Sequence, residues 1–230
     1  MKDQFAIVNQ KLTPQEQSIV AISALTAKGD ISQLKTNLAT GLDDGLTISE
    51  IKEELVQLYA YCGFPRSLNA INAFMAVLDE RKAKGINDPE GREASPVTVN
   101  DKYASGKKNL QTLTGIEETG PKKGANGFAP LIDTFLKEHL FADIFNRDIL
   151  TFEQRELITI STLATIIGVE PQLQAHIGMG MNIGLTEEQL KEAFALIKFV
   201  VGNKEGDSAV TILEKVVAAR NAATLKKTKG

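Results

Sequence analysis

The sequence predicts an all-α protein in which two tandem helical repeats pack as one pseudo-symmetric unit. Three observations support this prediction. Residues 33–63 recur as residues 172–202, an offset of 139 positions. Helix-start signals occur at matching places in the two copies. After each start the apolar residues are spaced by three or four, as on one face of a helix, and alternation typical of strands does not extend beyond a few residues.

Nine identical residues define the duplication. They pair Gln33, Leu34, Gly41, Gly45, Leu46, Thr47, Lys52, Glu53 and Gly63 with Gln172, Leu173, Gly180, Gly184, Leu185, Thr186, Lys191, Glu192 and Gly202. Matched positions indicate shared structure, and mismatched positions indicate where the copies differ in role.

Helix starts are marked by capping boxes, in which a threonine accepts a backbone N–H and a Glu or Gln three residues later reaches back to the cap. The boxes at 13–16 and 47–50 recur at 151–154 and 186–189. With the apolar spacing, they predict helices over 13–27, 31–43, 47–62, 66–83, 151–167, 170–182, 186–201 and 207–223.

The composition changes between the copies. Residues 84–130 carry most of the prolines and many of the glycines, which is typical of loops. We therefore divide the chain into a first repeat (1–84), a Gly/Pro-rich linker with a short helix near 99–113 (85–130), and a second repeat (131–230). Residues 131–145 are apolar with helical spacing and lead into the second repeat.

Composition narrows the functional classes. The chain has 230 residues and a net charge of −3, which does not favour nucleic-acid or acidic-membrane partners. It has a single cysteine, so an intrachain disulfide and a CxxC redox pair are excluded. No stretch approaches the roughly 20 apolar residues of a transmembrane helix. The first ten residues lack the apolar core of a signal peptide, and we expect a cytoplasmic protein.

Asn37 and His176 occupy matching positions on the apolar face of the second helix in each repeat. A polar residue there requires a hydrogen-bond partner once it is buried. Either both residues are satisfied polar groups of the core, or they line a polar cavity. In the second case His176 would be a general acid or base.

Two further positions on the third helix of each repeat are candidates. Glu53 and Glu192 match each other, and either could be an ordinary surface carboxylate. Cys62 matches Val201, which favours a packed structural thiol. The alternative is a reactive thiolate activated by a histidine or by a basic neighbour such as Arg66.

These residues resemble the signature of the carboxymuconolactone decarboxylase family. Glu53, Tyr61, Gly63, Pro65 and Ala70 resemble its E…Y-x-G-x-P…A half. The other half, R-E-L…H…G-x-T…E, is matched by Arg155-Glu156-Leu157, His176, Gly184-Leu185-Thr186 and Glu192. The resemblance implies an alkylhydroperoxidase D-like fold, a small-molecule substrate and ring-like oligomers with sites at helix interfaces. A two-repeat chain would then form a pseudo-hexameric trimer.

Two activities are implied by the resemblance. One is decarboxylation of a carboxylated unsaturated lactone, and the other is thiol-dependent peroxide reduction by a CxxC pair. The chain lacks CxxC, so peroxide reduction through Cys62 would need an external thiol. A third hypothesis is a non-catalytic oligomeric binding protein, because each repeat lacks half of the signature.

The complementary halves suggest one composite site without a metal or organic cofactor. In this hypothesis His176 transfers the proton, Glu53 or Glu192 orients it, and Tyr61 donates a hydrogen bond to a developing oxyanion. Arg66 or Arg147 would hold a substrate carboxylate, and Asn37 would line the substrate site. The hypothesis fails if Tyr61 and His176 lie more than roughly 10 Å apart. The other histidine, His139, is expected to be a structural or surface residue of the linking helix.

Overall fold

The computed structural model describes residues 11–227, with side chains up to residue 225. Residues 1–10, which carry the expectation of no signal peptide, lie outside this range. The described residues form helices and connecting loops without a strand, which confirms the predicted all-α fold. No helix in the described part of the chain is both long and apolar enough to cross a membrane.

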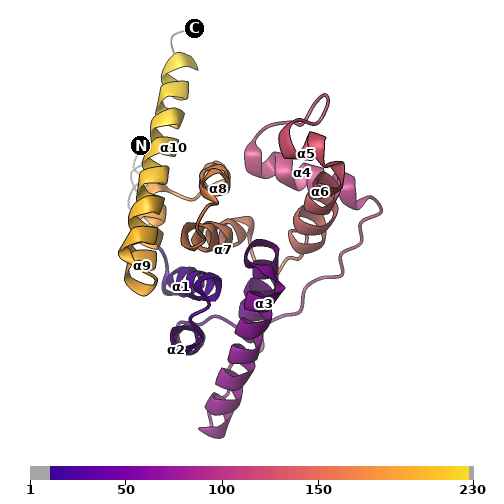
Figure 1. Ribbon diagram of the computed structural model, residues 1–230. Coiled ribbons are helices and arrows are strands. Elements are labelled where there is room, and N and C mark those ends of the chain that lie inside the picture. The colour runs from indigo at the N-terminus through magenta and orange to yellow at the C-terminus, as the bar shows by residue number, and fades with distance from the viewer. Residues whose placement is uncertain (1–10, 228–230) are drawn as a thin grey trace, which may run out of the picture.

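The two repeats consist of corresponding helices (Figure 1). The first repeat comprises α1 (Pro14–Lys28), α2 (Ile31–Asp43) and α3 (Ile48–Ala83), and the second comprises α7 (Phe152–Thr165), α8 (Glu170–Ile183), α9 (Glu187–Val200) and α10 (Asn203–Lys227). The offset of 139 residues places α7 on α1 and α8 on α2, while α9 and α10 match the two halves of α3. The eight predicted helices are therefore confirmed.

The predicted capping boxes all form. Thr13, Thr47, Thr151 and Thr186 are N-caps whose side chains accept from the backbone three residues on, and the Glu or Gln there bonds back to the cap. These reciprocal bonds satisfy N–H groups that the first helical turn leaves without partners.

Gly63 separates the two halves of α3. Its φ of 82° and ψ of 156° are non-helical and suit glycine, and Pro65 follows it. The two helices predicted at 47–62 and 66–83 therefore form, joined by a kink. The signature residues Tyr61 and Cys62 lie directly before this kink.

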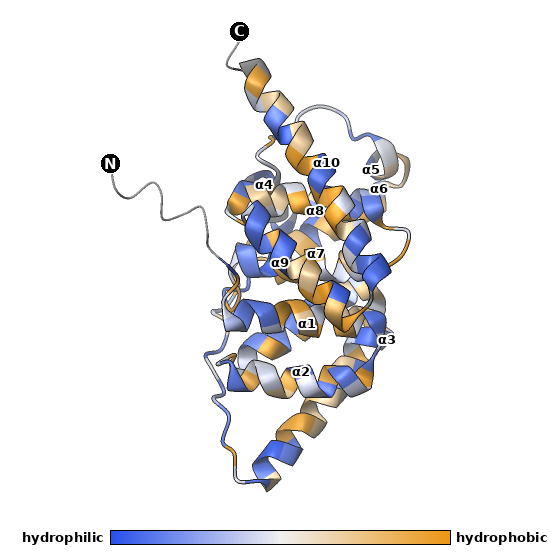
Figure 2. Cartoon of the chain, turned by 90° about the vertical axis from the view of Figure 1, so that its left-hand side faces the viewer, coloured by the Kyte–Doolittle hydropathy of each residue, from blue (hydrophilic) through white to orange (hydrophobic). Residues whose placement is uncertain are grey.

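The repeats pack around a central pair of helices, α1 and α7 (Figure 1). Each central helix also contacts the third helix of the other repeat, because α3 packs on α7 and α9 packs on α1. Residues 18–27 of α1 and 155–165 of α7 are all buried, whereas α2 and α9 carry both blue polar and orange apolar residues along their length (Figure 2). Residues of the two repeats thus meet at two equivalent junctions, α3–α7 and α1–α9.

The segment between the repeats contains α4 (Lys102–Thr114), α5 (Gly124–Phe128), α6 (Pro130–Thr134) and the π-helix η1 (Phe135–Ile144). The short helix predicted near 99–113 is α4, and the helical segment predicted at 131–145 is α6 with η1. Gly106 lets α4 lie against η1, because a Cβ there would come within 1.8 Å of the Lys137 carbonyl oxygen. Leu113 of α4 and Phe141 of η1 belong to a second hydrophobic cluster.

A buried ionic network holds this lobe together. The fully buried Asp133 accepts hydrogen bonds from Tyr103 (2.6 Å) and from Lys137 (2.7 Å), and it pairs with Lys122 (2.6 Å). Burial alone would raise the pKa of Asp133, but these donors lower it below its usual range. The network connects the loop before α5 to α4 and η1.

Candidate functional site

Tyr61 and His176 come from different repeats and lie side by side. Tyr61 ends the first half of α3, and His176 lies on α8. Their ring centroids are 5.7 Å apart in an edge-to-face arrangement with an interplanar angle of 84°. The two half-signatures therefore meet within one chain, inside the limit set by the composite-site hypothesis.

The partner of His176 is Glu156 of α7. His176 Nδ1 lies 2.8 Å from Glu156 Oε2, and Glu156 is fully buried while His176 is 8% exposed. The expectation that Glu53 or Glu192 orients His176 was therefore wrong. The matching residue of Glu156 is Gln17. The two mismatches, Gln17 with Glu156 and Asn37 with His176, were the signal in the sequence that could have identified the Glu156–His176 pair.

Glu53 is held by two arginines of the second repeat. Its carboxylate accepts from Arg155 Nη2 at 2.9 Å and from Arg147 Nε at 2.9 Å to each oxygen. Arg155 is fully buried and also donates to Gln57 Oε1 at 2.8 Å and to the Arg147 carbonyl at 2.7 Å. Glu53 thus anchors the α3–α7 junction, and sequence reasoning missed Arg155 and Gln57 as its polar neighbours.

Three buried polar atoms, on residues of α3 and α7 near the junction of these helices, have no hydrogen-bond partner within the described residues. They are Tyr61 Oη, Glu156 Oε1 and Arg155 Nε. Such atoms are rare in folded proteins and each carries a desolvation penalty. Burial, followed by the nearby Glu156 charge, raises the pKa of Tyr61. The hydroxyl therefore stays protonated at neutral pH and remains a hydrogen-bond donor.

Cys62 follows Tyr61 but has the properties of a neutral thiol. It is half-buried, and its Sγ donates to the Leu58 carbonyl at 3.2 Å. Burial raises the pKa of the thiol, and the charge of Arg66 only partly opposes this shift. Arg66 itself is exposed on the second half of α3.

Glu192 and Asn37 belong to the other junction. Glu192 accepts from the Leu12 N–H at 2.9 Å and from Gln17 Nε2 at 3.3 Å, which ties α9 to the start of α1. Asn37 is half-buried and its Nδ2 donates to the Gln33 carbonyl of its own helix at 2.9 Å. The structure does not bond either residue to the His176 cluster, in contrast to the predicted composite site.

The remaining candidates lie near the surface. The side chain of Arg147 is 42% exposed and, with Glu53 and Arg92, lines a small pocket of about 110 Å³. His139 is exposed on η1 and pairs with Asp143 at 3.1 Å. Within residues 11–227, no group of three His, Cys, Asp or Glu side chains is arranged to hold a metal ion.

These features define the class of the protein. It is a two-repeat helical protein with a His–Glu–Tyr cluster between its repeats. The model of the carboxymuconolactone decarboxylase family matches residues 2–76 and 130–215 of the chain. These segments cover most of the sequence, and the chain belongs to this family. A search of curated proteins finds no match.

Proposed function

We propose that the protein is a lyase or isomerase that acts by acid–base catalysis on a small carboxylated lactone or related metabolite, without an added cofactor. The observation that carries the proposal is the contact between Tyr61 and His176, with Glu156 2.8 Å from the imidazole. A histidine held by a buried carboxylate beside a protonated phenol supplies both a proton carrier and a hydrogen-bond donor.

In the proposed decarboxylation, the bond between the ring carbon and the substrate carboxylate breaks and carbon dioxide leaves. The electron pair moves into the conjugated carbonyl and forms an enolate, whose oxygen accepts a hydrogen bond from Tyr61. Protonated His176 then delivers a proton to carbon through Nε2, because Nδ1 faces Glu156. Glu156 stabilises the imidazolium before that transfer and fixes the orientation of the ring.

The substrate carboxylate requires a cation. Arg147 is already bound to Glu53 through Nε, whereas Arg66 is exposed and close enough to Cys62 to lower the pKa of that thiol. We therefore assign the carboxylate to Arg66 and keep Arg147 as the alternative. Substitution of each by Gln separates them, because loss of the true carboxylate ligand should raise KM about tenfold or more.

Formation of the predicted trimer in the cytoplasm is part of this proposal. Two sets of exposed apolar side chains support self-association, namely Phe64, Leu68 and Met75 on α3 and Phe128, Leu131 and Phe135 around α6. Because the sets differ, contact between them would be heterologous, which is the kind of contact that builds cyclic oligomers such as the proposed trimer. Light scattering should give three times the chain mass of 24.9 kDa.

Peroxide reduction through Cys62 is the second candidate and has weaker support. A thiol must ionise to attack a peroxide, and burial raises the pKa of this one. A non-catalytic binding role is the third candidate. A ligand bound without reaction could satisfy the same unpartnered atoms, so turnover of a substrate is what distinguishes this candidate from the first.

The proposal can be tested with a carboxylated unsaturated γ-lactone in D2O. We expect carbon dioxide release and one deuterium at the carbon accepting the proton, detected by NMR. Glu156→Gln should slow turnover by about 100-fold, and Glu188→Gln, at an exposed position on α9, should leave it unchanged. No turnover of any such lactone by the wild-type protein, or equal rates for both variants, would contradict the proposal.

A further inference from the structure

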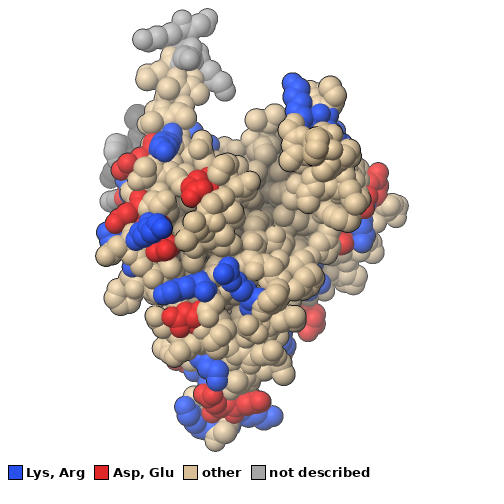
Figure 3. Space-filling model, viewed as in Figure 1, with Lys and Arg blue, Asp and Glu red and all other residues tan. Residues whose placement is uncertain are grey.

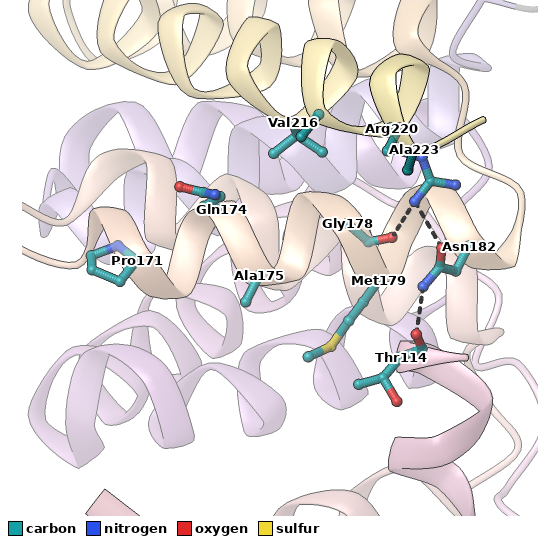
Figure 4. A pocket seen from close by; sticks show the side chains of 11 residues that line it. Thr114, Pro171, Gln174, Ala175, Gly178, Met179, Asn182, Val216, Arg220 and Ala223 are labelled. Carbon is teal, nitrogen blue, oxygen red and sulfur yellow. Dashed lines mark hydrogen bonds between the residues drawn. The ribbon is translucent and has the colours of Figure 1, made fainter. Parts of the chain in front are cut away.

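A groove of about 610 Å³ runs between α8 and α10 and ends at the last turn of α4 (Figure 4). Its walls are mostly apolar or small, and they include Pro171, Ala175, Met179, Val216 and Ala219. The hollow between α10 and the lobe of α4 to α6 is lined mainly by uncharged side chains, drawn tan (Figure 3). The volume lies within the range typical of small-molecule sites.

One cation, Arg220, lies at the α4 end of this groove. Its Nη1 donates to Asn182 Oδ1 at 2.8 Å and more weakly to the Gly178 carbonyl at 3.4 Å. Asn182 is oriented in turn, because its Nδ2 donates to the carbonyls of Leu113 (2.9 Å) and Thr114 (3.0 Å). Among the described residues both partners of Arg220 are neutral oxygens, and no carboxylate pairs with it.

The matching groove of the first repeat differs in its charges. There Arg81 corresponds to Arg220 and pairs with Asp43 at 2.8 Å and Asp88 at 2.7 Å. Asp43 corresponds to Asn182, so the second repeat keeps the guanidinium and replaces this carboxylate by an amide. Its groove therefore has a positioned cation without the anions that neutralise its counterpart.

The residues that line the groove are also less charged in the second repeat than in the first. The first groove contains Lys35, Glu80 and Lys84, whereas the matching residues of the second are Gln174, Ala219 and Ala223. At Gly178 an added Cβ would meet nothing within 4 Å. Glycine is unfavourable in the middle of a helix, and no contact in the described chain requires it here. The effect of Gly178 is to deepen the groove.

We propose that the groove between α8 and α10 binds an amphipathic carboxylate, with the carboxylate on Arg220 and the apolar body along Ala175, Met179 and Val216. Arginine suits this partner because its planar fork matches a carboxylate. His176 is not among the residues that line the groove. His176 precedes Gly178 by two residues and points about 200° around the helix from it. The inference does not depend on the proposed lyase activity.

Isothermal titration calorimetry of the intact protein with decanoate tests the proposal. We expect saturable binding that weakens at least about tenfold in Arg220→Gln and in Asn182→Asp, which restores the first repeat's ion pair. Lys204→Gln removes a charge from an exposed position on the same helix and should bind as wild type. Decanol, which lacks the carboxylate, should bind at least tenfold more weakly than decanoate.

A substitution that fills the groove can distinguish a ligand site from an interface between copies of the chain. Ala175→Trp should abolish decanoate binding and leave the oligomeric mass unchanged, because Ala175 is exposed on the groove wall. Equal affinity in Arg220→Gln and wild type would overturn the proposal, as would absence of decanoate binding to wild type. A change of oligomeric mass in Ala175→Trp would also overturn it, by identifying the groove as a contact between copies.

Discussion

The junctions α3–α7 and α1–α9 occupy equivalent places in the two repeats but have different chemistry. Both keep a glutamate, Glu53 in the first and Glu192 in the second. Six positions around this glutamate differ between the two sides. The α3–α7 junction and the adjacent α8 have Gln57, Tyr61, Arg155, Glu156, Thr159 and His176. The matching residues on the α1–α9 side are, in the same order, Leu196, Val200, Glu16, Gln17, Val20 and Asn37. One junction holds buried ionisable groups, and the other uses neutral or locally bonded ones.

This difference shows that equivalent junctions of a duplicated fold can have different roles. Buried charges are tolerated only when they are paired, and the cost of desolvating a buried pair can exceed the attraction between its charges. At the α1–α9 junction, Glu192 instead holds the segment before α1 through Leu12 and Gln17. We infer that this junction stabilises the fold, while the His176 cluster retains polar atoms that a substrate could satisfy.

The largest expected effect concerns the two matching glutamates, Glu53 and Glu192. Arg155→Met removes the fully buried partner of Glu53 and should lower the free energy of unfolding by about 3 kcal/mol. Glu192→Gln keeps an acceptor for Leu12 and should lower it by no more than about 1 kcal/mol. Urea denaturation measures both, and equal losses would remove the proposed distinction between the junctions.

The next effect separates activity from stability. Tyr61→Phe removes a buried hydroxyl that forms no well-aligned hydrogen bond among the described residues, although Thr159 is close enough to lower its pKa. Stability should therefore stay the same or rise by up to about 1 kcal/mol. Turnover of the lactone should fall by roughly 10- to 100-fold, because the oxyanion loses its donor. A variant that unfolds more easily would show that Tyr61 is held by a structural hydrogen bond instead.

A smaller effect depends on pH at Glu54, whose match is Ala193. Glu54 is buried and accepts from the Ser23 hydroxyl at 2.7 Å, and burial raises its pKa well above the ordinary 4.5. Above pH 4.5 the folded state retains a proton that the unfolded state releases, so stability falls as pH rises until the folded-state pKa is passed. Glu54→Gln should therefore stabilise the protein by about 1 kcal/mol at pH 7 and by less at pH 4.5.

Thermal unfolding at the two pH values measures this difference. Glu214→Gln, at an exposed position on α10, serves as the matched control and should show no such pH dependence. If the Glu54→Gln variant gained the same stability at both pH values, Glu54 would not be protonated in the folded protein.

The smallest effect is expected at Cys62. Cys62→Val installs the residue of the matching position, Val201, and should change lactone turnover by less than twofold. The wild-type thiol should react slowly with iodoacetamide at pH 7 and faster as pH rises, because burial raises its pKa. Rapid sulfenic acid formation at pH 7 under mild peroxide would instead support the peroxidase alternative.

Local signals predicted most of the fold. Capping boxes and three- to four-residue spacing gave the helix positions, because both depend on residues close together in sequence. The π-helical turns of η1 were not predicted, because the apolar spacing of 131–145 does not distinguish them from α-helix. The meeting of Tyr61 and His176 was predicted from their complementary loss in the two repeats.

The partner of His176 was missed for a physical reason. Apolar spacing assigned one buried face to the helix at 151–167, through Leu157, Ile160 and Leu163. In the structure every residue from 155 to 165 is buried, because α7 is packed between helices on several sides. Glu156 lies off this face, so the spacing gave no indication that it is buried. Asn37, in turn, was expected to line a cavity but bonds to its own helix.

We infer that the chain has one composite site, around His176, and that the matching residues on the α1–α9 side have no catalytic role. The most direct measurement is lactone turnover by His176→Asn and Asn37→His, which exchange the matching residues. We expect a loss of at least about 100-fold for His176→Asn and no change for Asn37→His. Wild-type turnover in His176→Asn, or a comparable loss in Asn37→His, would contradict it.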